Sequence, residues 1–79
     1  MQRNFETEMT QLGEYLDKKA ISKTAVANRT GISRSRMSEL TNNPSTHLKA
    51  KELYLIALAI DVEPNEIIKE VFKEVNLLA

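Results

Sequence analysis

Two helix starts, eleven residues apart, constrain the fold of this chain more than any other feature of its sequence. Ser22 and Ser33 are both residues that cap helices, and an isoleucine directly precedes each of them. An apolar residue stands at the fourth position of each helix, which completes the pattern of a hydrophobic staple. Gly31 lies between the two starts, where it suits the left-handed turn that ends a helix. The staple pairs are Ile21 with Val26 and Ile32 with Met37.

This spacing leaves room for only a very short turn, so the sequence predicts a helix-turn-helix whose second helix covers residues 33–42. Apolar residues elsewhere recur at spacings of three and four, which predicts an all-α single domain over residues 1–79. We expect further helices from about Asn4 to Lys19, from about Leu48 to Ile60 and from Pro64 onward, with a turn around 41–46. The side chains expected to face the core of these helices are Phe5, Met9, Leu12 and Leu16, then Leu53, Ile56, Ala57 and Ile60, then Ile67, Ile68, Val71 and Val75.

The zero net charge of the chain hides a segregation of its charged residues. Residues 20–51 carry six lysines and arginines against one glutamate. Residues 1–19 carry three basic against four acidic residues, and residues 52–79 carry two against six. A basic middle third between acidic ends favours a polyanion as the partner of that third.

The composition argues against several other classes of protein. With no cysteine and a single histidine, His47, the chain is expected to hold neither disulfides nor a metal. It has no glycine-rich phosphate loop and no pair of acids at a catalytic spacing, so we expect no enzyme activity and no cofactor. No apolar run approaches the roughly 20 residues of a membrane span and the N-terminus does not read as a secretory signal, which favours a cytoplasmic protein.

Several short motifs resemble the Cro/C1-type helix-turn-helix domains of phage repressors and related bacterial regulators. The resemblance implies a compact, five-helix, lambda-repressor-like domain that binds DNA, with the match covering about residues 10–70. This sequence departs from the family pattern in having Lys23 where glutamine is usual, Thr41 and Asn43 after the recognition helix, and Asp61 where a helix-ending glycine is common. The matching motifs are Ile21-Ser22, Val26-Ala27, Gly31-Ile32-Ser33, Met37-Ser38-Glu39-Leu40 and Ile56-Ala57-Leu58-Ala59-Ile60 with Val62.

Side chains at the start of the 33–42 helix are the candidates for reading base pairs. Met37 and Leu40 define the buried side of this helix, and Arg34 and Arg36 flank the opposite side. The guanidinium fork matches guanine O6 and N7, so we expect Arg34 to read a base and Arg36 to bind a phosphate or to support the reader. Glu39 can accept from cytosine N4 or hold an arginine in place. The predicted base contacts are Arg34, Ser35, Ser38 and Glu39.

Contacts to the DNA backbone are expected mainly at helix N-termini, where free N–H groups and the helix dipole attract phosphate. Lys23 matches a family position that touches phosphate, and the lysines at the start of the fourth helix extend the same basic surface. The predicted backbone contacts are Ser22, Lys23, Thr24, Ser33, Arg36, Asn42, Lys49 and Lys51.

The C-terminal end carries more apolar residues than the stripe of a fifth helix requires. Phe72, Val75, Leu77 and Leu78 either form a dimer surface or complete the core of one copy. A homodimer would strengthen the weak binding of one small domain and read two half-sites about 34 Å apart.

These observations predict a sequence-specific regulator that binds double-stranded DNA, most simply a repressor that occupies an operator. Two alternatives stay open. The first is an antitoxin-like or other interaction module whose main partner is a protein such as a toxin. The second is a small controller of a restriction-modification system, which activates as well as represses. The resemblance places all three in a prokaryote or a phage, near the nucleoid.

Overall fold

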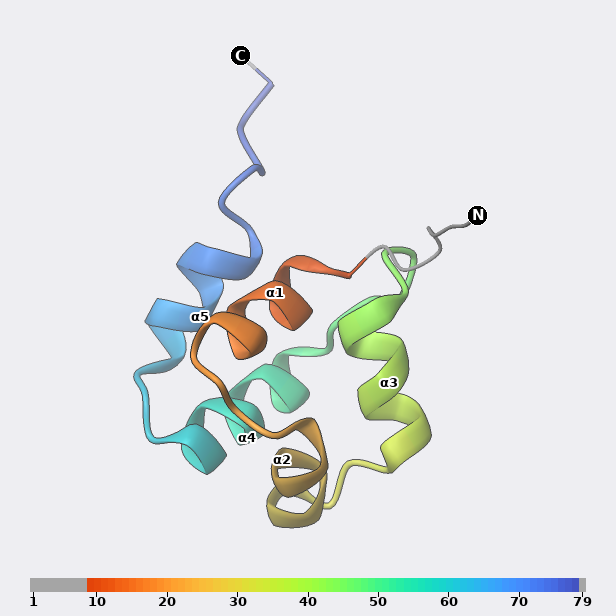
Figure 1. Ribbon diagram of the computed structural model, residues 1–79. Helices are drawn as coiled ribbons and strands as arrows, with labels where there is room; N and C mark the ends of the chain where they lie inside the picture. The colour runs from red at the N-terminus through yellow and green to blue at the C-terminus, as the bar shows by residue number, and fades with distance from the viewer. Residues whose placement is uncertain (1–8, 79) are drawn as a thin grey trace.

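The computed structural model describes residues 9–78, which form five helices and no strand (Figure 1). Five pairs of helices are in contact, namely α1 with α3, α1 with α5, α2 with α3, α2 with α4, and α4 with α5. These contacts close the helices around one core, which confirms the all-α fold. The helices are α1 (Gln11–Lys18), α2 (Lys23–Thr30), α3 (Arg34–Asn42), α4 (Ala50–Ile60) and α5 (Pro64–Val71).

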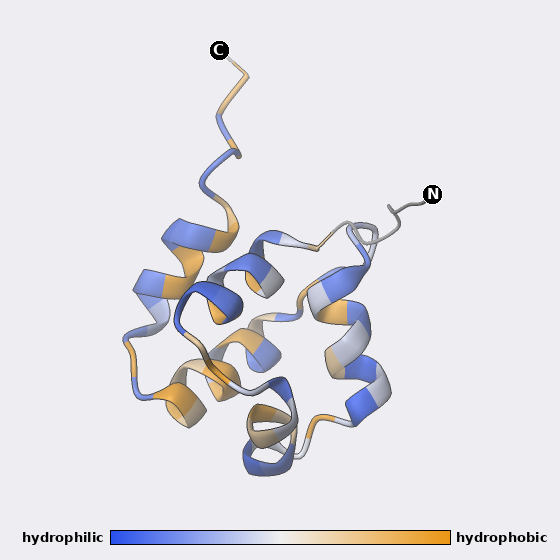
Figure 2. Cartoon of the chain, in the orientation of Figure 1, coloured by the Kyte–Doolittle hydropathy of each residue, from blue (hydrophilic) through white to orange (hydrophobic). Residues whose placement is uncertain are grey.

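The buried core draws on all five helices, and α4 is its most apolar member. Figure 2 shows α4 as mostly hydrophobic and α3 as mostly hydrophilic. Burial of one aliphatic core side chain stabilises the fold by about 1.5–3 kcal/mol. No helix within residues 9–78 is both long enough and apolar enough to span a membrane. The buried apolar residues are Leu12, Tyr15, Leu16, Val26, Ala27, Met37, Leu40, Leu53, Ile56, Ala57 and Ile67.

The first helix starts later than the sequence predicted. Thr10 has an extended backbone, and its Oγ1 accepts a hydrogen bond from the Gly13 N–H at 3.0 Å, so the helix begins at Gln11. The expected place of Met9 on the buried face is therefore wrong, because Met9 precedes the cap and is 36% exposed. Leu12 and Leu16 are buried as predicted. Asn4 and Phe5 lie outside the described residues.

The turn expected around 41–46 starts at Asn43, because α3 continues to Asn42, where the predicted 33–42 helix ends. Thr41 is fully buried in the last turn of the helix. Its Oγ1 donates to the Met37 carbonyl at 2.9 Å, so the buried hydroxyl is satisfied within the helix. A residue that reads as part of a turn is thus a helical core residue.

The start of α4 lies at Ala50, two residues after the expected start at about Leu48. Lys49 has the extended backbone of an N-cap, and its N–H donates to a carboxylate oxygen of Glu52 at 3.0 Å. The predicted inward side of α4 is confirmed for Leu53, Ile56 and Ala57, which are buried, and for Ile60 in part.

The apolar stripe predicted for α5 is buried only in part. Pro64 occupies the first helical position as expected, and Ile67 is fully buried. Ile68, however, is 43% exposed. Val75 is 70% exposed because the helix ends at Val71, so Val75 cannot share its inward face.

Candidate nucleic-acid interface

The two helix starts that define the motif fold as the sequence predicted. Ser22 caps α2 by accepting a hydrogen bond from the Ala25 N–H at 3.1 Å, and Ser33 caps α3 by accepting one from the Arg36 N–H at 3.0 Å. Gly31 ends α2 with a φ of 82°, a left-handed conformation that glycine adopts without steric cost. Only the segment 31–33 separates the two helices, so the helix-turn-helix is confirmed.

The C-terminal end of α3 is held by the start of α1. The Thr10 N–H donates to the Thr41 carbonyl at 2.9 Å, and Thr10 Oγ1 donates to the Leu40 carbonyl at 2.7 Å. Gly13 faces the same point, where an added Cβ would lie 2.3 Å from the Thr41 carbonyl oxygen. The sequence did not predict this anchor, and a glycine inside a helical pattern is the one signal that could have indicated it.

The predicted base-contact residues lie together on the outward side of α3. Met37 and Leu40 are buried on the inward side, at 2% and 4% exposure. Asn42 Nδ2 donates to Ser38 Oγ at 3.5 Å, so these two short polar side chains are neighbours. A helix with one buried and one polar exposed side is suited to lie in a groove of DNA. The exposed residues are Arg34, Ser35, Ser38, Glu39 and Asn42.

A shallow hollow of about 170 Å³ lies between α2 and α3 on the side of Arg34. It brings the predicted backbone contacts of α2 next to the predicted base contacts of α3. Lys23, at its edge, is also 3.6 Å from Asp17 Oδ1, an ion pair between α2 and α1. The polar residues that line the hollow are Lys23, Thr24, Arg34, Ser38, Thr41 and Asn42.

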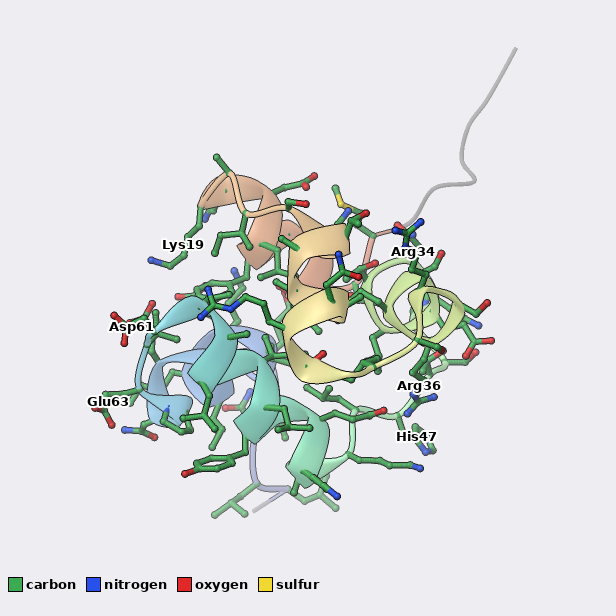
Figure 3. The ribbon with its side chains drawn as sticks, turned by 90° about the horizontal axis from the view of Figure 1, so that it is seen from below. Lys19, Arg34, Arg36, His47, Asp61 and Glu63 are labelled. Carbon is green, nitrogen blue, oxygen red and sulfur yellow. The ribbon has the colours of Figure 1, made fainter. Side chains whose placement is uncertain are left out.

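Arg36 points to the opposite side of α3 from Arg34, toward His47 (Figure 3). Its Nε donates to Glu52 Oε2 at 2.7 Å, and its Nη2 donates to Glu52 Oε1 at 3.0 Å. Nη2 also donates to the His47 carbonyl at 2.9 Å. The sequence did not predict this pairing, which joins α3 to α4 and to the segment before it. The phosphate contact expected of Arg36 stays an untested prediction.

The pair between Arg36 and Glu52 shifts the pKa of both groups. The hydrogen bonds from Arg36 lower the pKa of the Glu52 carboxyl, although partial burial acts in the opposite direction. The same hydrogen bonds raise the pKa of the Arg36 guanidinium. Both groups are therefore charged at neutral pH. Glu39 is more loosely attached, with its Oε1 3.8 Å from Arg36 Nη1.

A second polar contact holds α1 against α5, away from α3. The Tyr15 hydroxyl donates to Glu66 Oε2, and Lys19 Nζ lies 3.4 Å from the same oxygen. Burial, followed by the bond to Glu66, raises the pKa of Tyr15, and the bond from Tyr15 lowers the pKa of Glu66. This contact belongs to the scaffold and provides a comparison for the pair at Arg36.

The remaining predicted site residues lie at the two ends of the second half of the chain. Lys49 and Lys51 are exposed at the start of α4, in the turn that also carries Glu52. Phe72 caps the end of α5 and is 43% exposed. Leu77 and Leu78 are almost fully exposed, and the last described residues extend away from the body of the protein (Figure 1).

Comparison with known families agrees with this geometry. A family model described as the Cro/C1-type HTH DNA-binding domain matches residues 11–73, a range that contains all five helices. The chain therefore belongs to the Cro/C1-type helix-turn-helix family, and it is a DNA-binding regulator. Neither the curated proteins nor the solved structures gave a match.

Proposed function

We propose that the chain is a sequence-specific repressor that occupies an operator in double-stranded DNA. The observation that supports this best is the outward side of α3, where five polar residues are exposed on a helix whose other side is buried. The major groove of B-DNA is about 12 Å wide and admits one α-helix. The family is typically non-enzymatic, in keeping with regulation by occupancy alone.

Arg34 is the residue that we propose reads a base. It occupies the first position of α3, and the N-terminal residues of the second helix of such a motif contact base edges. Within residues 9–78 its guanidinium forms no ion pair, so the fork is available for guanine O6 and N7. One good bidentate contact discriminates against a wrong base by about 1–3 kcal/mol. Ser35, Ser38 and Glu39 complete the proposed reading surface.

The phosphates on one side of the groove are proposed to meet the start of α2. Lys23 and Thr24 line the hollow beside Arg34, and the free N–H groups of the first turn of α2 favour an anion. Six neutralised phosphates correspond to a slope of about −5 in a plot of log affinity against log salt concentration. The other proposed backbone contacts are Ser22, Ser33, Asn42, Lys49 and Lys51.

Two copies are proposed to bind together, because one domain with so few basic residues binds weakly. The exposed C-terminal residues Phe72, Val75, Leu77 and Leu78 supply the apolar surface. A groove of about 540 Å³ at the same end, between the start of α1 and the end of α5, supports a pairing in which it receives the partner's tail. Its apolar lining includes Met9, Leu12, Leu40, Leu48, Val71 and Phe72. Sedimentation of a Leu77→Asp, Leu78→Asp variant tests this: a dimeric variant would exclude the tail from the interface.

The same exposed tail favours a second candidate, an antitoxin-like module whose main partner is a protein. Apolar residues at 94% exposure, such as Leu77, are as suited to a different chain as to a second copy. A partner that copurifies in a fixed ratio and is lost in the tail variant would favour this candidate. A reporter gene behind the selected operator separates repression from the activation expected of a restriction-modification controller.

The deciding experiment is fluorescence anisotropy with a pool of random duplex DNA over a series of salt concentrations, followed by selection of the operator from that pool. We expect salt-dependent binding by the wild type. The Arg34→Ala variant should lose about 1–3 kcal/mol of binding free energy for the selected operator. Arg29→Ala is the matched control, because Arg29 is exposed near the end of α2 and does not line the hollow. A folded wild type that binds no DNA at low salt would exclude the repressor.

A further inference from the structure

Arg36 differs from Arg34 in having its Nε and Nη2 donors already hydrogen bonded within the protein, while its Nη1 lies 3.8 Å from Glu39 Oε1. Its Nε and Nη2 bind the two oxygens of Glu52 as a fork, at 2.7 and 3.0 Å, and Nη2 also binds the His47 carbonyl at 2.9 Å. Bidentate pairs of this kind fix the direction of the guanidinium as well as its place. In Figure 3 this direction is away from Arg34, on the other side of α3.

The partner of Arg36 is fixed as well. The Glu52 side chain is 13% exposed, and its Oε1 accepts a further hydrogen bond from the Lys49 N–H at 3.0 Å. A phosphate that drew Arg36 away would leave this partly buried carboxylate without its counter-charge, which is costly. The carboxylate therefore competes with the DNA backbone for the same guanidinium.

We propose that Arg36 is a positioning residue that does not contact DNA, and that its ion pair with Glu52 keeps the Arg36 guanidinium from binding a phosphate. The pair fixes the first turn of α3 against α4 and the segment that carries His47. The same pair removes one sequence-independent attraction while leaving Arg34 free, so it raises the ratio of operator binding to random binding. This inference rests on the proposed function, since it concerns how the same helix reads DNA.

The position of the pair explains why it affects base reading. Arg34 lies two residues before Arg36 in the same first turn, so any shift of this turn moves the fork of Arg34 relative to a base. The other end of α3 is fixed independently, by Thr10 and Gly13. Without the pair, the helix would keep one anchor and lose the one nearer to the reading residue.

The test compares Arg36→Ala, Glu52→Gln and the double variant, each titrated against random duplex DNA and the selected operator over a salt series. Loss of a real phosphate contact makes the salt slope shallower by about 1. We expect Arg36→Ala to keep the wild-type slope on random DNA. We expect Glu52→Gln to bind random DNA more tightly with a slope steeper by about 1, because Arg36 is released, and the double variant to lose this gain. Both single variants should discriminate less between operator and random DNA.

The opposite pattern overturns the inference. A shallower salt slope for Arg36→Ala would show that Arg36 binds a phosphate. Unchanged affinity of Glu52→Gln for random DNA would show that Glu52 does not keep Arg36 from the phosphates. Arg36→Met keeps the apolar stem and loses only the fork, so it replaces Arg36→Ala if that variant is unfolded at the assay temperature. Absence of binding by the wild type would instead overturn the proposed function itself, which separates the two failures.

Discussion

The two ends of α3 are held in different ways. At the C-terminal end, Thr10 binds carbonyls of the last turn, and Gly13 lets α1 approach Thr41 so closely that no side chain fits between them. At the N-terminal end, a charged pair of side chains, Arg36 and Glu52, joins α3 to α4. Close-packed backbone tolerates almost no change in volume, whereas a side-chain pair at the edge of the core can be changed without altering the packing of the core.

This difference separates stability from binding along one helix. The buried end carries Asn42, a predicted backbone contact, but no predicted base reader, so changes there act mainly on the folded state. The charged end lies beside Arg34, so changes there alter how the helix meets DNA while the core stays intact. Substitutions that affect one end and not the other can test whether the separation holds.

The largest expected effect is at Gly13. A Gly13→Val substitution places a Cβ 2.3 Å from the Thr41 carbonyl oxygen, which forces α1 and α3 apart. We expect a loss of about 3 kcal/mol in the free energy of unfolding, corresponding to a fall in Tm of at least about 10 °C for a domain of this size. Thermal melting by circular dichroism measures it. The control is Glu14→Val at the exposed neighbouring position, where the loss should stay under about 1 kcal/mol. Equal Tm values for the two variants would contradict the close contact.

The second effect is at Thr10, which caps α1 and binds the end of α3. Thr10→Ala removes the hydroxyl that accepts from Gly13 and donates to Leu40. We expect a loss of about 1–2 kcal/mol in the free energy of unfolding, measured in urea. Thr10→Ser keeps the hydroxyl and should recover most of it. If serine were as destabilising as alanine, the hydroxyl would not be what holds the two helices.

A smaller effect is expected at Ser33, the cap at the opposite end of α3. Its Oγ accepts from the Arg36 N–H at 3.0 Å, but it is exposed and, within residues 9–78, makes no bond to another helix. Ser33→Ala should cost about 1 kcal/mol, and Ser33→Gly only a few tenths. For each kcal/mol lost in the free energy of unfolding, Ser33→Ala should weaken operator binding more than Thr10→Ala does. The reverse order would show that the charged end has no special role in binding.

The smallest effect is the dependence of stability on pH. Because the folded-state pKa of Glu52 is lowered, its stabilisation is present at pH 7 and is lost as the pH falls below the unfolded value of about 4.3. Melting between pH 7 and pH 3 should therefore show a smaller acid-induced fall in Tm for Glu52→Gln than for the wild type.

Glu66 provides the comparison for this last prediction. Its pKa is lowered by the bond from Tyr15, so Glu66→Gln should also reduce the acid-induced fall in Tm. At pH 7, however, only Glu52→Gln should change the salt slope of DNA binding. A matching change in Glu66→Gln would mean that general loss of negative charge, and not release of Arg36, is responsible.

Most of the fold could be predicted from the sequence, and the boundary furthest from its prediction, the start of α1, lies at a contact between distant segments. The starts of α2 and α3 depend on residues within four positions of Ser22 and Ser33, so local patterns were sufficient. The start of α1 lies against the end of α3, where Thr10 and Thr41 are joined across 31 positions of the chain. Periodicity along one segment contains no information about such a contact.

The candidate site divides in the same way. The exposed side of α3 follows from helical geometry once Met37 and Leu40 are recognised as buried. The difference between Arg34 and Arg36 does not follow, because both flank the same face and have the same chemistry. Only the placement of Glu52 on α4, sixteen positions away, shows that one fork is occupied.

By itself, the sequence determined the helix-turn-helix, its caps and the polar outward side of its second helix. These features arise from interactions between residues one to four positions apart, which form in any context that buries the apolar stripe. The tertiary structure decided how closely α1 crosses α3 and which arginine is paired. Those outcomes depend on the distance and angle between helices, and packing of the whole core sets both.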